Sequence, residues 1–394
     1  MARSLAKDSI PSGWKYGLLD KFATRCSGHT PSKSFPEYWD GGIKWISLAD
    51  SFRLDQGYVY ETEKEISEAG IANSSAELHP AETVVLSRDA GIGKSGVMAE
   101  PMAVSQHFIA WKCDNSEKLN SWFLYNWLQL NKAEFERQAV GSTIKTIGLP
   151  YFKKLKIAVP PYSEQKKIAK ILSTWDKAIA TSEQLLANSQ QQKKALMQQL
   201  LTGKKRLLDK NGVRFSGEWK RVELGDLLDY QQPTPYLVES TEYSDDFPTP
   251  VLTAGKTFIL GYTDEESGIF SEQLPAIIFD DFTTDSKFVD FPFKAKSSAM
   301  KILTSKDGVS IRFVYEAMQL LDFAVGGHQR HWISIYSRLV IPFPVKEEQQ
   351  KIAAVLSTAD QEISTLQQKL EALKQEKKAL MQQLLTGKRR VNIN

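Results

Sequence analysis

The stretch RDAGIGKS, from Arg88 to Ser95, ends in the Gly-Lys-Ser triplet of a phosphate-binding loop. Such a loop also needs a glycine five residues before Gly93, so that its backbone N–H groups can wrap around the phosphates. Arg88 occupies that position, and no acidic strand suited to hold magnesium is evident. We therefore interpret the stretch as a tight turn between two strands, in which Arg88, Lys94 and Ser95 still carry groups that can reach phosphates.

The tetrapeptide VPPY, from Val159 to Tyr162, matches the Asp/Asn-Pro-Pro-Tyr motif of adenine methyltransferases except at its first residue. In those enzymes the first side chain accepts a hydrogen bond from the amino group to be methylated. Val159 has no acceptor atom. Prolines that end a strand before a helix are the simpler interpretation.

An acidic cluster at Asp280, Asp281 and Asp285, followed by Lys287, has the residue types of a nuclease Asp…Asp-x-Lys site. Short acidic clusters are also common in turns, where their side chains bond to nearby backbone. The five histidines are scattered and lack metal-ligand spacing. The sequence therefore predicts no catalytic residue and no metal site.

The composition limits the class of protein. A chain of 394 residues is too long for one ordinary core, and its net charge of +3 permits an acidic partner such as nucleic acid without requiring one. Its only cysteines, Cys26 and Cys113, form no disulfide framework, which fits a reduced compartment. The first residues contain no apolar run, so we expect no signal peptide, and no run of ~20 apolar residues suggests a membrane span. We expect a cytoplasmic protein that has no membrane partner.

The twelve residues KKALMQQLLTGK occur twice, at 193–204 and at 377–388, an offset of 184 residues (377 − 193). At the same offset, SEQKKIAKILSTWDKAI (163–179) aligns with EEQQKIAAVLSTADQEI (347–363). A weaker echo, SGW at Ser12 and SGEW at Ser216, precedes each copy. The chain therefore alternates twice between a globular region and a repeated segment.

Each repeated segment is predicted to be a long helix. Its apolar residues alternate in steps of four and three, which forms a heptad seam, although the middle of the first copy is polar. Gly203 and Gly387 follow the last periodic residues as expected C-terminal caps. The predicted helix–helix interface consists of Ile168, Leu172, Trp175, Ile179, Leu186, Leu196, Leu200, Ile352, Leu356, Ile363, Leu366, Leu370, Leu380 and Leu384.

The two helices, each ~60 Å long, are expected to pair with each other. The second globular region joins the end of the first helix to the start of the second, so an antiparallel pair needs no long connection. We predict an α/β fold in which two irregular α/β domains are separated by an antiparallel pair of long coiled-coil helices with pseudo-two-fold symmetry. The expected boundaries are 1–160 and 206–343 for the globular domains, and 161–205 and 344–390 for the helices.

The globular regions share their expected element order but differ in most exposed residues. In each, strand–turn–strand segments precede an amphipathic helix, a polar glycine-bearing loop and a short strand. A recent duplication would explain matching helices but not the divergence of the globular regions. Two copies of one external partner, docked on the two helices, would explain both.

In these features the chain resembles the specificity subunits of type I restriction–modification systems. The resemblance covers essentially the whole chain, and the order and duplication of its motifs make it specific. It rests on the duplicated PxxxEQxKIAxxLSxxD and KKALMQQLLTGK blocks, on the SGW and SGEW openings, and on LSRDAGIGKSG and IIFDDFT in strand–turn positions.

The resemblance implies a non-catalytic protein in which each globular domain is a target recognition domain. Each domain would read one half of a bipartite, asymmetric target in double-stranded DNA, while the helices set the spacer and dock two methyltransferase subunits. Restriction subunits then join, and S-adenosylmethionine, ATP and magnesium belong to the partners, so this chain needs no cofactor. The alternatives are a self-sufficient restriction or modification enzyme with a nuclease site at Asp280–Lys287, and a scaffold that never meets nucleic acid.

The candidate DNA contacts are basic, hydroxyl and amide side chains on the glycine-containing loops. Gln329 and Arg330 suit bidentate reading of adenine and guanine, whereas lysines more readily hold phosphates. The full set is Lys33, Arg88, Lys94, Ser95, Ser142, Thr143 and Lys145 in the first domain, and Lys256, Lys287, Lys294, His328, Gln329, Arg330 and His331 in the second.

Overall fold

A computed structural model of the chain describes residues 10–113, 117–141, 145–255, 257–322 and 331–392. The chain divides into two compact units, unit 1 (Met1–Ser182 and Lys369–Asn394) and unit 2 (Glu183–Gln368). Each unit therefore contains one globular region together with part of each long helix. The boundaries predicted from the sequence, at 160, 205 and 343, instead separate each globular region from the long helix that follows it. They stay a prediction about domains.

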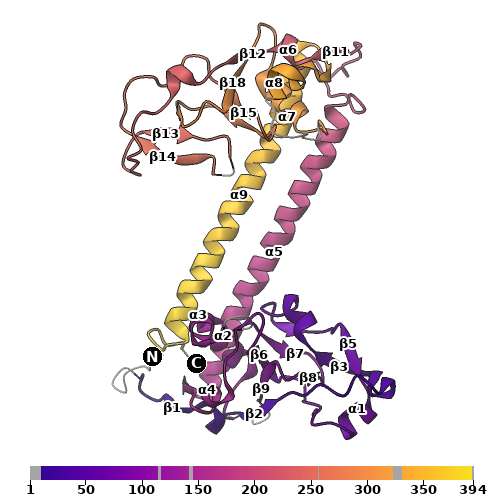
Figure 1. Ribbon diagram of the computed structural model, residues 1–394, viewed down its shortest axis with the longest axis vertical. Coiled ribbons are helices and arrows are strands. Elements are labelled where there is room, and N and C mark those ends of the chain that lie inside the picture. Colours follow the sequence, from indigo (N-terminus) through magenta and orange to yellow (C-terminus); the bar gives the residue numbers. More distant parts are fainter. Residues whose placement is uncertain (1–9, 114–116, 142–144, 256, 323–330, 393–394) are drawn as a thin grey trace. The chain divides into compact units, whose positions relative to one another are not determined.

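Unit 1 contains, within the described residues, sheets with the strand orders β2-β9-β6-β7-β4, β5-β3-β8 and β1-β10 (Figure 1). Its strands are β1 (Lys15–Leu18), β2 (Thr24–Ser27), β3 (Trp39–Ile46), β4 (Tyr58–Val59), β5 (Lys64–Ile66), β6 (Val84–Ser87), β7 (Ser95–Met98), β8 (Ala103–Val104), β9 (Phe108–Lys112) and β10 (Lys156–Val159). Its short helices are α1 (Glu68–Ala72), α2 (Ser121–Leu130), α3 (Lys132–Gln138) and α4 (Leu149–Lys153).

Unit 2 contains, over the same described ranges, sheets with the orders β12-β18-β15-β16, β14-β13-β17 and β11-β19. Its strands are β11 (Lys220–Glu223), β12 (Leu228–Gln231), β13 (Thr249–Leu252), β14 (Ile259–Thr263), β15 (Ala276–Asp280), β16 (Ser286–Val289), β17 (Lys294–Ala295), β18 (Met300–Ser305) and β19 (Val340–Phe343). Its short helices are α6 (Leu224–Leu227), α7 (Ile311–Met318) and α8 (His331–Ser334).

The two globular regions share one topology, as the sequence predicts. The order β2-β9-β6-β7 in unit 1 corresponds to β12-β18-β15-β16 in unit 2. In the smaller sheets, β3 and β13 each pair with one antiparallel and one parallel neighbour. The first strand of each region also pairs antiparallel with the strand that enters the long helix, β1 with β10 and β11 with β19. The divergent sequences therefore build the same framework.

The central strands are buried on both faces, which explains their continuous apolar runs. In β6, Val84 and Leu86 pack in the cluster that contains Phe123 of α2, whereas Val85 packs in a second cluster on the opposite face. Because successive side chains of a strand point to opposite faces, an unbroken apolar run serves two cores. In β15, Ile277 and Ile278 divide between two clusters in the same way.

The repeated segments form the helices α5 (Tyr162–Leu200) and α9 (Lys346–Leu384), which pack together as predicted (Figure 1). They run antiparallel within each unit: in unit 2, Ser189 contacts Glu362 and Lys193 contacts Asp360, so one residue number rises as the other falls. Gly203 and Gly387 have φ values of 73° and 71°, which confirms their predicted role as C-terminal caps.

The helix ends enter the cores of the globular regions. In unit 1 the core contains Ile168 and Leu172 of α5 together with Met381, Leu384 and Leu385 from the end of α9. The core of unit 2 contains the five residues at the 184-residue offset: Ile352, Leu356, Met197, Leu200 and Leu201. Of the predicted interface, Ile168, Leu172, Leu200, Ile352, Leu356, Leu370 and Leu384 are buried, and Trp175, Ile179, Leu186, Leu196, Ile363, Leu366 and Leu380 are half-buried.

A buried glutamine fastens the start of each long helix to its globular region. Gln165 donates to the carbonyl of Pro160 and accepts from the N–H of Asn120, the N-cap of α2. Its repeat equivalent, Gln349, donates to the carbonyl of Pro344 and accepts from the N–H of Ser310, the N-cap of α7.

No helix within the described ranges has both the length and the apolar character that crossing a membrane requires.

Candidate nucleic-acid interface and its anchors

The RDAGIGKS stretch is a turn between β6 and β7, as the sequence analysis prefers. Gly91 and Gly93 both have positive φ, and the N–H of Gly93 donates to the carbonyl of Ser87 across the turn. A phosphate-binding loop requires a helix directly after its Gly-Lys-Ser triplet, but Ser95 begins a strand here.

Two predicted contacts lie on this turn and are held by backbone carbonyls. The Nε of Arg88 donates to the carbonyl of Ile147 at 3.1 Å, and the Nζ of Lys94 donates to the carbonyl of Ser51 at 3.0 Å. Both side chains remain partly exposed, to 20% for Arg88, and Arg88 keeps guanidinium N–H groups for another partner. The turn thus presents two positioned cations.

Asp89 links this turn to two other segments of unit 1. Its carboxylate lies 2.6 Å from the Nδ1 of His107 and accepts from the hydroxyl of Thr146. Thr146 directly follows Lys145, which is exposed. The segment that directly follows Lys145 therefore lies beside the turn that carries Arg88. Lys33 is exposed as well, but no hydrogen bond or ion pair among the described residues joins it to this group.

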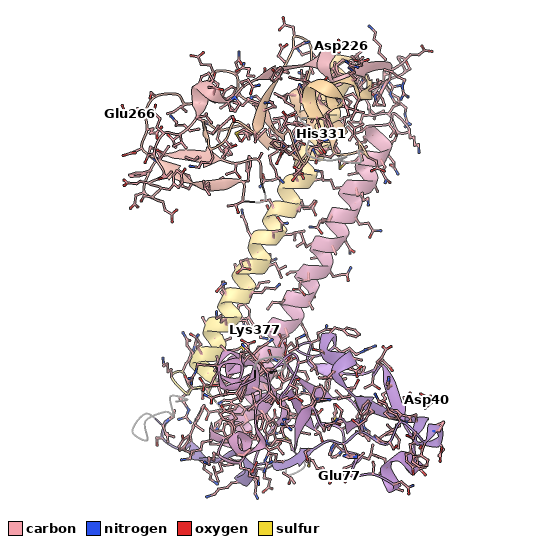
Figure 2. The ribbon with its side chains drawn as sticks, in the orientation of Figure 1. Asp40, Glu77, Asp226, Glu266, His331 and Lys377 are labelled. Carbon is pink, nitrogen blue, oxygen red and sulfur yellow. The ribbon has the colours of Figure 1, made fainter. Side chains whose placement is uncertain are left out.

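Three predicted contacts are buried, which corrects the sequence-based set. Ser95 accepts from Gln129 at 2.8 Å inside unit 1, and Lys294, 2% exposed, forms an ion pair with Glu265 at 2.7 Å. His331 is also buried, with its Nδ1 3.0 Å from the carbonyl of Asp281 (Figure 2 labels His331). These side chains stabilise the fold and are not available to DNA in this structure.

The other predicted contacts include one half-buried lysine, Lys287 on β16. The remaining predicted contacts lie outside the described residues; they are Ser142, Thr143, Lys256, His328, Gln329 and Arg330.

Two carboxylates of the acidic cluster, Asp280 and Asp281, accept hydrogen bonds from backbone N–H groups. Asp280 accepts from the N–H of Phe282 at 2.9 Å, and Asp281 accepts from the N–H of Trp332 at 2.9 Å. Asp281 also lies 3.5 Å from the buried Nζ of Lys301. Among the described residues these carboxylates do not meet at a point where a metal ion would fit. The nuclease alternative therefore receives no support from this cluster.

The long helices are anchored by ion pairs that the sequence analysis did not predict. In unit 1 the guanidinium of Arg390 donates to both oxygens of the buried Glu164, at 2.7 and 2.8 Å, and lies over the ring of Trp14. Arg390 also donates to the carbonyl of Ser12 at 2.8 Å. One side chain thus joins the SGW opening, the start of α5 and the segment after α9.

Unit 2 repeats the same anchor. Arg206 donates to both oxygens of the buried Glu348, at 2.7 Å each, and lies over the ring of Trp219, whose Nε1 also donates to Glu348. Arg206 and Glu348 are the equivalents of Arg390 and Glu164 at the 184-residue offset. That shared offset is the signal that would have identified both pairs from the sequence.

A second repeated ion pair lies along the helices. Lys377 pairs with Asp176 in unit 1 (Lys377 is labelled in Figure 2), and Lys193 pairs with Asp360 at 2.7 Å in unit 2. Each lysine occupies a seam position that an apolar residue would fill in a regular heptad. The charged seam position is therefore matched by an aspartate from the facing helix.

Comparisons with known proteins agree with this duplicated architecture. The sequence model for the type I restriction modification DNA specificity domain matches residues 11–188 and again residues 216–375. The chain belongs to this family. The two matched segments each contain one globular region and most of one long helix, so the family domain is present twice in this specificity-domain protein.

Individual relatives extend the comparison. The specificity subunit of the EcoR124I/EcoR124II type I restriction enzyme of Escherichia coli is 51% identical over 145 residues, which cover 36% of this chain and 35% of that protein. The match thus spans about a third of that relative's length. The MjaVIII specificity subunit of Methanocaldococcus jannaschii is 23% identical over 98% of this chain and 95% of its own. Among solved structures, the type I system S subunit from M. genitalium has the same fold, with a TM-score of 0.65, 15% identity and 97% of both chains covered.

Proposed function

We propose that this chain is the non-catalytic, cytoplasmic DNA-specificity subunit of a type I restriction–modification complex, and that each globular region reads one half of a bipartite target in double-stranded DNA. The observation that carries the proposal is the contrast between repeated anchors and divergent loops. Equivalent ion pairs, Arg390–Glu164 and Arg206–Glu348, attach the two globular regions to the long helices. The loops that connect the strands of the two regions differ in sequence. Two globular regions that have different loops but equivalent attachments to the helices are expected to recognise two different half-sites, and hence an asymmetric target.

The exposed face of the repeated helices supports docking of two methyltransferase subunits. Within KKALMQQLLTGK, Lys194, Gln198 and Gln199 are exposed, and so are Lys378, Gln382 and Gln383 at the equivalent positions. Core packing does not require identity at exposed positions. Two copies of one external subunit would require it, because each copy must meet the same side chains. Restriction subunits would then join, with S-adenosylmethionine, ATP and magnesium bound to the partner subunits.

The proposed DNA contacts after the structural correction are Arg88, Lys94, Lys145 and Lys33 in unit 1 and Lys287 in unit 2. Lys145 directly precedes Thr146, which contacts the turn that carries Arg88, and this proximity favours the two residues as contacts of a single DNA segment. Gln329 and Arg330 remain proposals for base reading, and Ser142, Thr143, Lys256 and His328 remain proposals as loop contacts. The lysines would hold phosphates, which fix the position of the protein on the duplex without reading its sequence.

The experiment is methylome sequencing of a methylation-free host that carries this chain with its methyltransferase gene. We expect adenine methylation at a target of two unlike half-sites separated by a non-specific spacer. A paired strain in which residues 206–343 are replaced by those of a relative should change one half-site and leave the other intact. A continuous or palindromic target, methylation without this chain, or a change in both half-sites would each contradict the proposal.

A further inference from the structure

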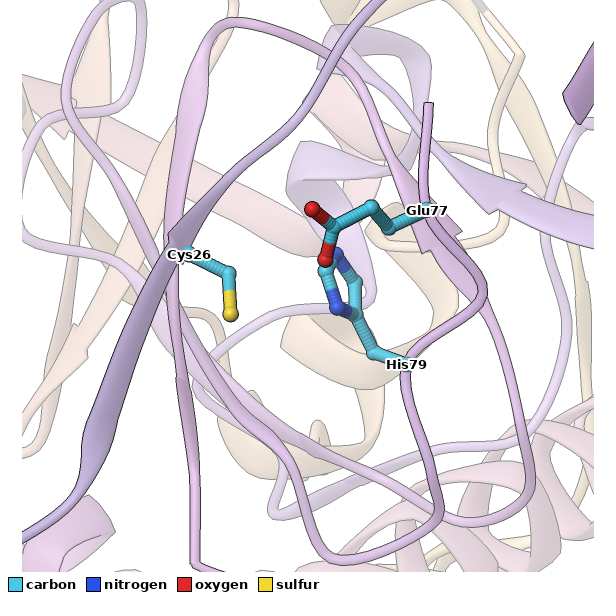
Figure 3. Close-up of side chains that lie close together, drawn as sticks. All are labelled: Cys26, Glu77 and His79. Atoms are coloured by element: carbon cyan, nitrogen blue, oxygen red, sulfur yellow. The ribbon is translucent and has the colours of Figure 1, made fainter. Parts of the chain in front are cut away.

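Cys26, Glu77 and His79 bring three different metal-binding groups together in unit 1 (Figure 3). Cys26 lies on β2, at the edge of its sheet, and the other two lie in the segment between α1 and β6. Their ligand atoms, a thiol sulfur, a carboxylate oxygen and an imidazole nitrogen, all lie within 4.8 Å of one another. Within the described residues this is the one such group.

His79 provides a second, independent observation. Its side chain is 0% exposed, and neither Nδ1 nor Nε2 has a hydrogen-bond partner in the described part of the protein. The backbone is fixed, because His79 and Met102 exchange hydrogen bonds at 2.8 and 3.0 Å. A buried polar group without a partner is costly and calls for an explanation. An imidazole binds a metal ion through the lone pair of a ring nitrogen, so a metal would give this buried ring a partner.

The donor set selects the metal. Thiolate and imidazole favour zinc, which is bound by sulfur and nitrogen with a carboxylate or water completing a tetrahedron. Calcium and magnesium prefer oxygen ligands alone. Zinc bond lengths of ~2.0–2.3 Å require the three donor atoms to converge on one point. Glu77 has a side chain that is 59% exposed and Cys26 is half-buried, so both can make that adjustment around the fixed His79.

Lys112 opposes the binding of a cation. Its Nζ lies 3.3 Å from the Oε2 of Glu77, so a metal must displace an ammonium group from that carboxylate. This competition predicts an affinity below that of a dedicated zinc site, and it supplies a variant that should tighten binding.

We propose that Cys26, Glu77 and His79 form a zinc site that fastens the edge strand β2 to the segment preceding β6, with water as the fourth ligand. Binding requires the Cys26 thiol to lose its proton to solvent, which leaves the thiolate as ligand. The site is independent of the proposed DNA-specificity function, because it needs neither DNA nor a partner subunit.

The test is calorimetric titration of the full-length, tag-free chain with zinc after chelator treatment, in two buffers of different protonation enthalpy. We expect one equivalent to bind with release of one proton, and cobalt to give the charge-transfer band of a thiolate ligand. Cys26→Ser should abolish that band and weaken zinc binding at least tenfold, and His79→Gln should weaken it similarly. Lys112→Met should tighten binding several-fold. Cys113→Ser, which changes the other cysteine, is the control and should bind as the parent chain does.

Two outcomes would overturn the proposal. One is zinc binding that is unchanged in both Cys26→Ser and His79→Gln, which would assign it to other surface groups. The other is no binding to the parent chain at micromolar zinc. Circular dichroism of each variant separates loss of the site from loss of the fold.

Discussion

The Arg390–Glu164 anchor allows a quantitative test of how unit 1 is held together. Arg390→Met retains most of the aliphatic side chain but removes the guanidinium, which leaves the buried carboxylate of Glu164 without its bidentate partner. Breaking a buried pair in this way costs about 3–5 kcal/mol, because one charge stays uncompensated. The Arg390 side chain is 43% exposed, so water can approach the carboxylate after the substitution. We therefore expect the low end of that range, a loss of about 3 kcal/mol.

The assay is urea unfolding combined with hydrogen exchange, because the two units can unfold in separate steps and a single transition would hide the effect. Protection should fall at the start of α5 and the end of α9. Lys388→Met removes the same charge from an exposed position and should change stability by less than about 0.5 kcal/mol. Adding Glu164→Gln to Arg390→Met should recover part of the loss, because the unpaired charge disappears. Equal effects of Arg390→Met and Lys388→Met would refute the reasoning.

Three further predictions concern DNA and partner binding. Inserting seven residues into both α5 and α9 adds ~10 Å of helix, or about three base pairs at ~3.4 Å each, so methylome sequencing should show a longer spacer with unchanged half-sites; an unchanged spacer would argue against the helices as a ruler. Arg330→Ala should cost about 1–3 kcal/mol in binding at one half-site only, whereas uniform weakening on all DNA would assign Arg330 to phosphate contact. Lys194→Glu and Lys378→Glu should each reduce co-purification of the methyltransferase subunit without shifting the melting temperature; the exposed Lys177, whose repeat equivalent is Gln361, is the control, and an equal loss in Lys177→Glu would indicate a non-specific charge effect.

The long helices were predictable because their signal is local. Heptad periodicity placed the helix starts within two residues of those observed, whereas the predicted ranges run five residues (205 − 200) and six residues (390 − 384) past the observed helix ends. The periodicity did not reveal that Met197 and Leu201, or Met381 and Leu385, are buried. These side chains lie beside the heptad seam and pack into the cores of the globular regions. A heptad pattern describes only the contact between two helices, so it does not predict contacts between a helix and a globular region.

The candidate site was less predictable, because loop residues of the same type can be either exposed or buried. Lys145 is exposed, whereas Lys294 is buried against Glu265, twenty-nine residues earlier in the chain (294 − 265). Ser95 directly follows a half-exposed cation yet points into the interior of unit 1. Composition and turn signals identify the loop, but exposure depends on which distant segment covers it.

The repeat contains two kinds of identical position, residues that pair within the chain and exposed residues that do not. Glu164 and Arg390, with Glu348 and Arg206, are fixed by internal pairing: a change in one partner leaves a buried charge, so both copies of each must persist. Lys194 and Lys378 are exposed and have no such constraint, yet they are identical. The proposed docking of two copies of one partner would account for that identity, because each copy would meet the same side chains. Internal pairing alone would keep the buried positions and allow the exposed ones to diverge, as the globular regions have diverged, so the exposed identities are the stronger argument for two copies of one partner.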